Sequence, residues 1–132
     1  IMFWKKKGIV PNSNWRELEK VQADDMKKRN PDYKIQTQKV YRGYGKRPDI
    51  YGQHKTIPHK RIGGESKCVK ELTSKNVKQA KSYKKHPGYL SSVEIGVCKE
   101  TKVTHKVRKE AKDSGMKVKR YNVKREKSWW QI

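Results

Sequence analysis

The chain has 132 residues, which is enough for one domain and short for two. Its 35 Lys and Arg residues outnumber 13 Asp and Glu residues, so the formal net charge is +22, and 32% of the residues are hydrophobic. No stretch approaches the roughly 18 consecutive apolar residues of a transmembrane helix, so we expect no membrane-spanning segment. The charge favours a polyanionic partner: nucleic acid first, with an anionic membrane surface or an acidic protein as alternatives.

Composition alone would also fit a disordered basic segment. Apolar residues nevertheless recur with helix and strand periods along most of the chain, which predicts a thinly cored folded domain. We place an N-terminal extension or linker at residues 1–14 and the domain at residues 15–132. Because the chain begins with Ile, we expect it to be part of a longer precursor.

The first predicted element is a helix over residues 15–29. Asn12-Ser13-Asn14 offers N-cap side chains, and Asn30-Pro31 ends the helix because a residue before proline resists helical dihedrals. The residues expected to face the core recur at helical spacing: Trp15, Leu18, Val21 or Gln22, and Met26.

Three strands are predicted next, over residues 32–42, 48–53 and 61–72, from their β-branched and aromatic content. Gly63-Gly64 in the third strand indicates a bulge or the close approach of another backbone. A helix to about Lys85, a strand over 89–100, a helix from about Thr101 and a strand over 116–125 follow. The order α-β-β-β-α-β-α-β predicts a single α/β domain, a mixed sheet flanked by helices.

Cys68 and Cys98 are the only cysteines, and they form no CxxC pair. We expect two buried thiols, with a disulfide as the alternative. The cysteines and the four histidines lack the spacing of a zinc site.

The acidic residues of the central region indicate a candidate metal-binding site. Asp49 is the only Asp between residues 33 and 112, and Glu65-Ser66-Lys67 follows on the next predicted strand. Residues i and i+2 of a strand share a face, so Glu65 and Lys67 are expected side by side, with Asp49 reachable across a hairpin. Two carboxylates would suit a hard divalent cation, Mg²⁺ first and Mn²⁺ or Zn²⁺ as alternatives. The competing interpretation is that Glu65 pairs with a neighbouring Lys and Asp49 caps a turn.

This arrangement resembles the PD-(D/E)xK nuclease superfamily, through Pro48-Asp49 and Glu65-Ser66-Lys67 inside an α-β-β-β-α-β order. The resemblance covers residues 15–123 and implies a restriction-endonuclease-like core. It implies a metal-dependent endonuclease in which Asp49 and Glu65 hold the cation and Lys67 is catalytic.

The resemblance extends to two helices. Members of the superfamily commonly add a metal-binding Glu on the first helix, here Glu19 with Glu17 as the rival; a solvated acid paired with Lys is the alternative. Some branches carry Gln-x-x-x-Tyr on the helix after the third strand. Gln79 and Tyr83 match that pattern and would contact substrate or orient the lysine, with a plain surface role as the alternative.

Two features depart from the family pattern or extend it. Ser66 stands where an apolar or small residue is usual, and the long link between Asp49 and Glu65 contains His54 and His59. His54 would serve as a phosphate contact or proton carrier, although a solvent-exposed role is the simpler interpretation. Lys46 and Arg47, just before the site, are expected substrate contacts.

The resemblance leaves several functions open. Members include restriction endonucleases, archaeal Holliday-junction resolvases and toxin domains of contact-dependent growth inhibition systems. We expect a nuclease of the toxin kind, acting on DNA or tRNA in the bacterial cytoplasm after delivery from a secreted or cell-surface precursor, with an acidic immunity protein as partner. The alternatives are a non-catalytic basic nucleic-acid-binding domain, a restriction or junction-resolving enzyme, and a metal-independent ribonuclease using a histidine.

Overall fold

A five-stranded mixed sheet runs through the centre of the computed structural model, which describes residues 14–37, 48–84 and 90–125. Its strands follow chain order: β1 (Tyr33–Thr37), β2 (Ile50–His54), β3 (Arg61–Lys67), β4 (Ser92–Val97) and β5 (Met116–Arg120). The helices of the described residues are α2 (Trp15–Arg29), α3 (Ser74–Ser82) and α4 (His105–Asp113). The domain is therefore α/β, and the predicted order of elements is confirmed.

The sheet changes direction at β3. Strands β1, β2 and β3 form an antiparallel meander, whereas β3, β4 and β5 are parallel. Parallel neighbours need a crossover, which α3 supplies between β3 and β4 and α4 supplies between β4 and β5. The strand that carries Glu65 and Lys67 is thus the junction of the two halves.

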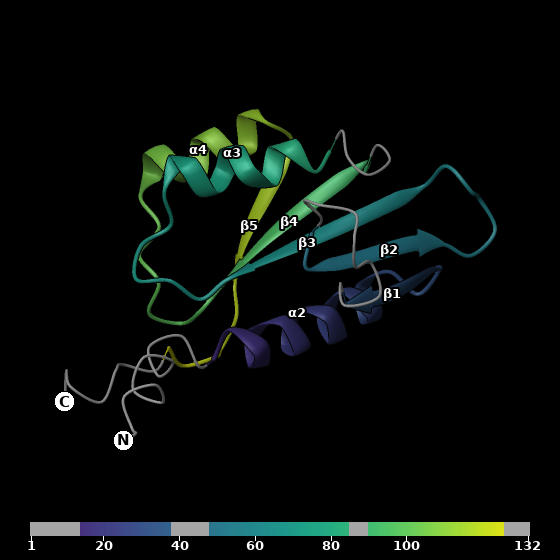
Figure 1. The fold of residues 1–132 in the computed structure, drawn as a ribbon, viewed down its shortest axis with the longest axis horizontal. Helices are drawn as coiled ribbons and strands as arrows, with labels where there is room; N and C mark the ends of the chain where they lie inside the picture. Colours follow the sequence, from purple (N-terminus) through teal and green to yellow (C-terminus); the bar gives the residue numbers. More distant parts are fainter. Residues whose placement is uncertain (1–13, 38–47, 85–89, 126–132) are drawn as a thin grey trace, which may run out of the picture.

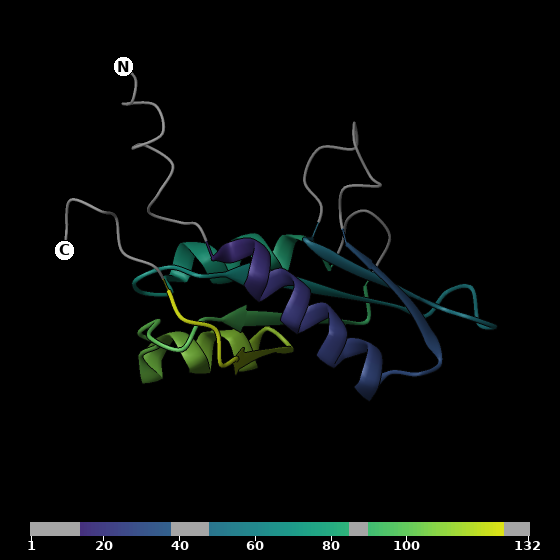
Figure 2. The ribbon, with the colours of Figure 1, turned by 90° about the horizontal axis from the view of Figure 1, so that it is seen from below.

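Helices cover both faces of this sheet. Helix α2 packs on one face, and α3 and α4 pack on the other (Figure 1). Figure 2, which views the molecule from below, shows α2 crossing the strands obliquely. One core cluster lies under α3 and α4 around Val93, Ile95 and Val97, and two smaller clusters lie under α2. The central strands are consequently buried on both sides, including Glu65 and Glu94.

Local sequence accounts for the ends of α3 and α4. The Thr73 side chain accepts a hydrogen bond from the Asn76 backbone N–H, and the Asn76 side chain accepts one from the Thr73 N–H, which is a capping box. Thr104 caps α4 by accepting from the Val107 N–H. Gly115, with φ of 75°, lies after α4 in the left-handed region, which is typical of a glycine at a helix C-terminal cap.

Some details of the sequence prediction are wrong. The β2–β3 register continues through Gly63 and Gly64 without a bulge. These glycines instead leave room for side chains: a Cβ at Gly63 would lie 2.6 Å from Leu90 Cδ1, and one at Gly64 would lie 2.9 Å from Met26 Sδ. Trp15, expected in the core, is 39% exposed because it opens α2 at the edge of the packed region.

The expectation of two free thiols is also wrong, because Cys68 and Cys98 form a disulfide. Each cysteine follows the last residue of one of the neighbouring parallel strands β3 and β4, and their Cα atoms are 4.9 Å apart. Both lie on the α2 side of the sheet, packed with Leu18 and Tyr121. The sheet register brings them together across a sequence separation of 30 residues.

Within the three described stretches, no helix is long and apolar enough to cross a membrane.

Candidate active site

The register of β2 and β3 brings the two predicted carboxylates together. Ile50 pairs with Gly64, so one further step along the antiparallel ladder places Asp49 opposite Glu65. The backbone N–H of Asp49 donates to Glu65 Oε1 at 3.3 Å. The backbone N–H of Ser66 donates to Asp49 Oδ2 at 2.9 Å. Asp49 is therefore held across the strand pair by the residue between Glu65 and Lys67.

Lys67 lies beside this pair and is oriented from α3. Its Nζ is 3.4 Å from Glu65 Oε2 and donates to Gln79 Oε1 at 3.1 Å. The Gln79 Nε2 in turn donates to the hydroxyl of Tyr83, one helical turn on, at 3.2 Å. The structure therefore unites five predicted site residues, with Gln79 in the role of orienting the lysine.

Burial shapes the electrostatics of the carboxylates. Burial first, and the negative charge of Asp49 second, raise the pKa of Glu65 to about 8, although Lys67 opposes both effects. Burial also raises the pKa of Asp49, while the Ser66 N–H, Lys67 and a hydrogen bond to Glu65 act against that rise. At neutral pH burial and the neighbouring Asp49 therefore favour the protonated form of Glu65.

Tyr83 closes the buried side of the site. Burial and the nearby charge of Glu65 raise the pKa of Tyr83 to about 12, against the hydrogen bond from Gln79. The side chain is buried among the residues under α3, so it remains a neutral phenol at physiological pH. Its role here is to hold the Gln79 carboxamide.

The donor set fits a hard divalent cation. Two carboxyl groups converge in a buried place where their mutual repulsion favours a bound positive charge, and Mg²⁺ is commonly held through one or two carboxylates with water in its other positions. In the described part of the chain, no group of three or more His, Cys, Asp or Glu side chains is placed to hold a metal. Glu19, half-buried on α2, is therefore not grouped with the pair, and Glu17 is exposed. The metal-binding role of Glu19 stays a prediction.

The structure does not bring His54 to the carboxylates. His54 is the last residue of β2, whereas Asp49 precedes the first. The His54 Nδ1 accepts the backbone N–H groups of Thr56 and Ile57 at 3.1 and 3.0 Å, and the ring meets Tyr33 edge-on. Its evident role is to order the turn after β2. The predicted substrate contacts Lys46 and Arg47 lie outside the described residues.

Sequence reasoning missed a second polar cluster on the α2 side of the sheet. Gln22 and Glu94 are buried there, at 0% and 7% exposure, and their side chains are hydrogen-bonded at 3.1 Å. Arg29 and Tyr121 both donate to the Glu94 carboxylate, at 2.8 Å each. One signal was available: Glu94 interrupts an otherwise apolar strand, where a lone acid needs partners.

Comparisons with protein-family models, with curated protein sequences and with solved structures found no match to this chain.

Proposed function

We propose that the protein is a metal-dependent nuclease of the PD-(D/E)xK kind, hydrolysing phosphodiester bonds of DNA or tRNA. One observation carries the proposal: the buried Glu65, the half-buried Asp49 and Lys67 converge where β2 meets β3, in a protein of net charge +22. Such an arrangement is costly for stability, because both acids are desolvated. It is useful where a cation and a phosphate must meet.

The residues divide the work as follows. Asp49 and Glu65 would hold the cation, which when bound polarises a phosphate and lowers the pKa of a water. Lys67, held by Gln79, places a positive charge beside the same carboxylates, where negative charge develops on the phosphate oxygens during hydrolysis. Ser66 contributes its backbone N–H, which fixes one oxygen of Asp49.

A non-catalytic nucleic-acid-binding domain is the second candidate, favoured by the charge itself. On this interpretation the acids are structural: Glu65 is ion-paired with Lys67, and Asp49 accepts the Ser66 N–H. The two candidates differ in what a divalent cation does. It is required for the nuclease and unnecessary for the binding domain.

The test is cleavage of plasmid DNA and of total tRNA by the wild type, Asp49→Asn and Glu65→Gln, each with Mg²⁺, Mn²⁺, Zn²⁺ or EDTA. Asp113→Asn, purified in the same way, is the matched control, because Asp113 is an exposed acid at the end of α4 paired only with Lys109 in the described structure. We expect the first two variants to lose at least a hundredfold in activity and the control to match the wild type.

Each other outcome is informative. Cleavage that persists in EDTA would show that the reaction does not require a divalent cation. Cleavage that survives in Asp49→Asn would show that the carboxylate pair is not required for it. Equal binding of nucleic acid by all four proteins, with no cleavage by any, would establish the binding-domain alternative. The polymer that is cut decides between DNA and tRNA.

A further inference from the structure

Gln22 is an unusual residue for its place in the fold. It lies in the middle of α2 with no exposed surface, between the helix and the strands β3 and β4. An apolar side chain of similar size would fill that space without the cost of burying an amide. The amide therefore needs an explanation in what it contacts.

The Gln22 carboxamide bridges the two central strands. Its Oε1 accepts the hydroxyl of Ser66 on β3 at 2.8 Å. Its Nε2 donates to the Glu94 carboxylate at 3.1 Å and to the Glu94 backbone carbonyl at 3.3 Å, both on β4. The carboxamide thus ties β3 and β4 to α2.

Two glycines make space for this amide. A Cβ at Gly64 would lie 3.2 Å from the Gln22 Nε2, and a Cβ at Gly96 would collide with the Gln22 carboxamide. Gly96 is the register partner of Ser66. The space left by its missing side chain therefore lies directly beside the Ser66 hydroxyl, which donates a hydrogen bond to Gln22. The pocket for Gln22 is built into both strands.

Ser66 connects this buried cluster to the candidate active site. Its hydroxyl faces α2 and Gln22, while Glu65 and Lys67 project to the opposite face of β3. Its backbone N–H donates to Asp49 Oδ2 at 2.9 Å. A shift of β3 at Ser66 would therefore move the bond to Asp49 and both flanking side chains together.

We propose that Gln22 and Ser66 are positioning residues that fix the Glu-x-Lys strand against the carboxylate of Asp49. This inference rests on the proposed nuclease function and names residues that lie on the other side of the sheet from the chemistry. The Glu94 carboxylate, held in turn by Arg29 and Tyr121, keeps the Gln22 amide in one orientation. Small displacements of catalytic groups cost rate more than affinity.

The test is a double-mutant cycle with Gln22→Met and Ser66→Ala in the full 132-residue chain. We expect each variant to lower kcat about tenfold, with KM for nucleic acid within about twofold of the wild type. The double variant should lose little more than either single one, because both changes break the same hydrogen bond. The matched control is Ile35→Val, which trims the same helix–sheet interface away from the site.

Hydrogen exchange at the Ser66 amide supplies a readout that does not depend on cleavage. We expect this amide to exchange about tenfold faster or more in Gln22→Met, because its bond to Asp49 loosens, and to be unchanged in Ile35→Val. Unchanged Ser66 exchange, additive losses in the cycle, or an equal loss of kcat in Ile35→Val would each overturn the inference. A wild type that cuts nothing while Ser66 exchange responds would refute the nuclease proposal and leave the positioning contact standing.

Discussion

The raised pKa of Glu65, beside Asp49, is the feature of the site most open to experiment at the scale of single residues. Glu65 has its pKa raised from 4.5 to about 8 by burial and by Asp49, so it is largely protonated at neutral pH. A carboxyl group must lose its proton to bind a metal ion. Proton and cation therefore compete for the same oxygens.

We predict that Mn²⁺ binding at pH 6.5 releases about one proton, and that this release falls toward zero by about pH 9. Calorimetric titrations in two buffers of different ionisation enthalpy measure the number directly. Glu65→Gln, which has no proton to lose, is the control and should release fewer. Proton release near zero at both pH values in the wild type would contradict the raised pKa.

The same raised pKa sets the sign of a stability change. Because the folded state of the metal-free protein binds the Glu65 proton more tightly than the unfolded state, this group lowers the unfolding free energy progressively as pH rises from about 4.5 to about 8. A cation bound above pH 8 would relieve the repulsion. Thermal unfolding measured with and without Mn²⁺ across this pH range therefore tests this stability change alongside the proton-release measurement.

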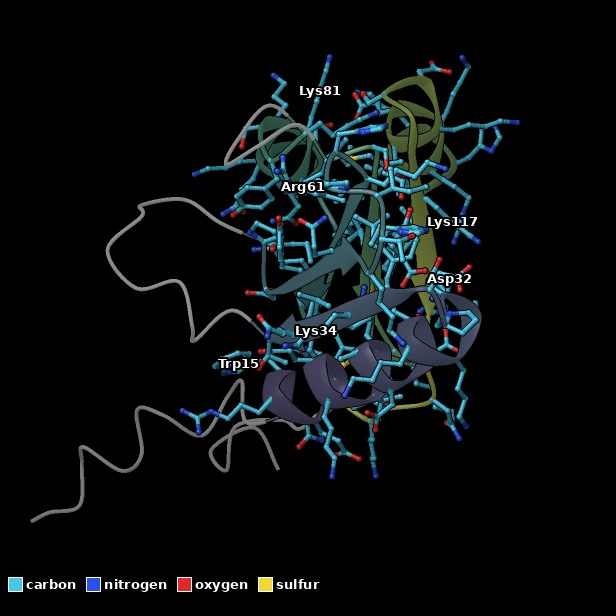
Figure 3. The ribbon with its side chains drawn as sticks, turned by 90° about the vertical axis from the view of Figure 1, so that its right-hand side faces the viewer. Trp15, Asp32, Lys34, Arg61, Lys81 and Lys117 are labelled. Carbon is cyan, nitrogen blue, oxygen red and sulfur yellow. A yellow bond between two sulfur atoms is a disulfide. The ribbon has the colours of Figure 1, made fainter. Side chains whose placement is uncertain are left out.

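At the scale of elements, α3 connects the site to the solvent-exposed charge. Gln79 faces Lys67 from this helix, and the exposed lysines Lys75 and Lys78 lie on the adjoining surface. Figure 3 shows Lys81, further along the same helix, on the outside of the molecule and Arg61 nearer the sheet. A nucleic acid lying along α3 would therefore bring its phosphates close to the carboxylate pair.

We predict that Lys75→Gln with Lys78→Gln weakens binding of duplex nucleic acid and lowers the slope of log K against log salt by about 0.9 for each phosphate that the protein no longer neutralises. The matched control is Lys20→Gln with Lys27→Gln, two exposed lysines on α2 across the sheet. Fluorescence anisotropy in EDTA separates binding from cleavage. An equal loss of affinity in the control pair would show that net charge, and not α3, governs binding.

The whole molecule combines a large self-repulsion with a thin core, split by the sheet into one larger and two smaller clusters. The disulfide closes a loop between the ends of β3 and β4 and restricts the unfolded chain. It also lies one residue beyond Lys67. The covalent bond therefore supports the strands that carry the site.

We predict that reduction lowers the unfolding free energy by about 3 kcal/mol. Denaturant unfolding with and without reductant measures the change. The double variant Cys68→Ala with Cys98→Ala is the control, and its stability should not respond to reductant. Two free thiols titrating in the denatured, unreduced wild type would contradict the disulfide.

Much of the fold and part of the candidate site followed from the sequence alone. Helix and strand periods and the capping residues are local, so the order of all eight described elements was predicted correctly. Glu65 and Lys67 share a face by strand alternation, and Gln79 reaches Tyr83 by one helical turn. Each of these relations spans four residues or fewer.

Only the tertiary structure decided the remaining relations, because they depend on sheet register and on what covers each face. The β2–β3 register places Asp49 opposite Glu65, and the β3–β4 register joins Cys68 to Cys98. The position of α2 over β3 and β4 buries Gln22 and Glu94 together and makes them hydrogen-bond partners. The partners of Gln22 are Ser66 and Glu94, which lie 44 and 72 residues away from it along the chain, and only packing brings such distant groups together.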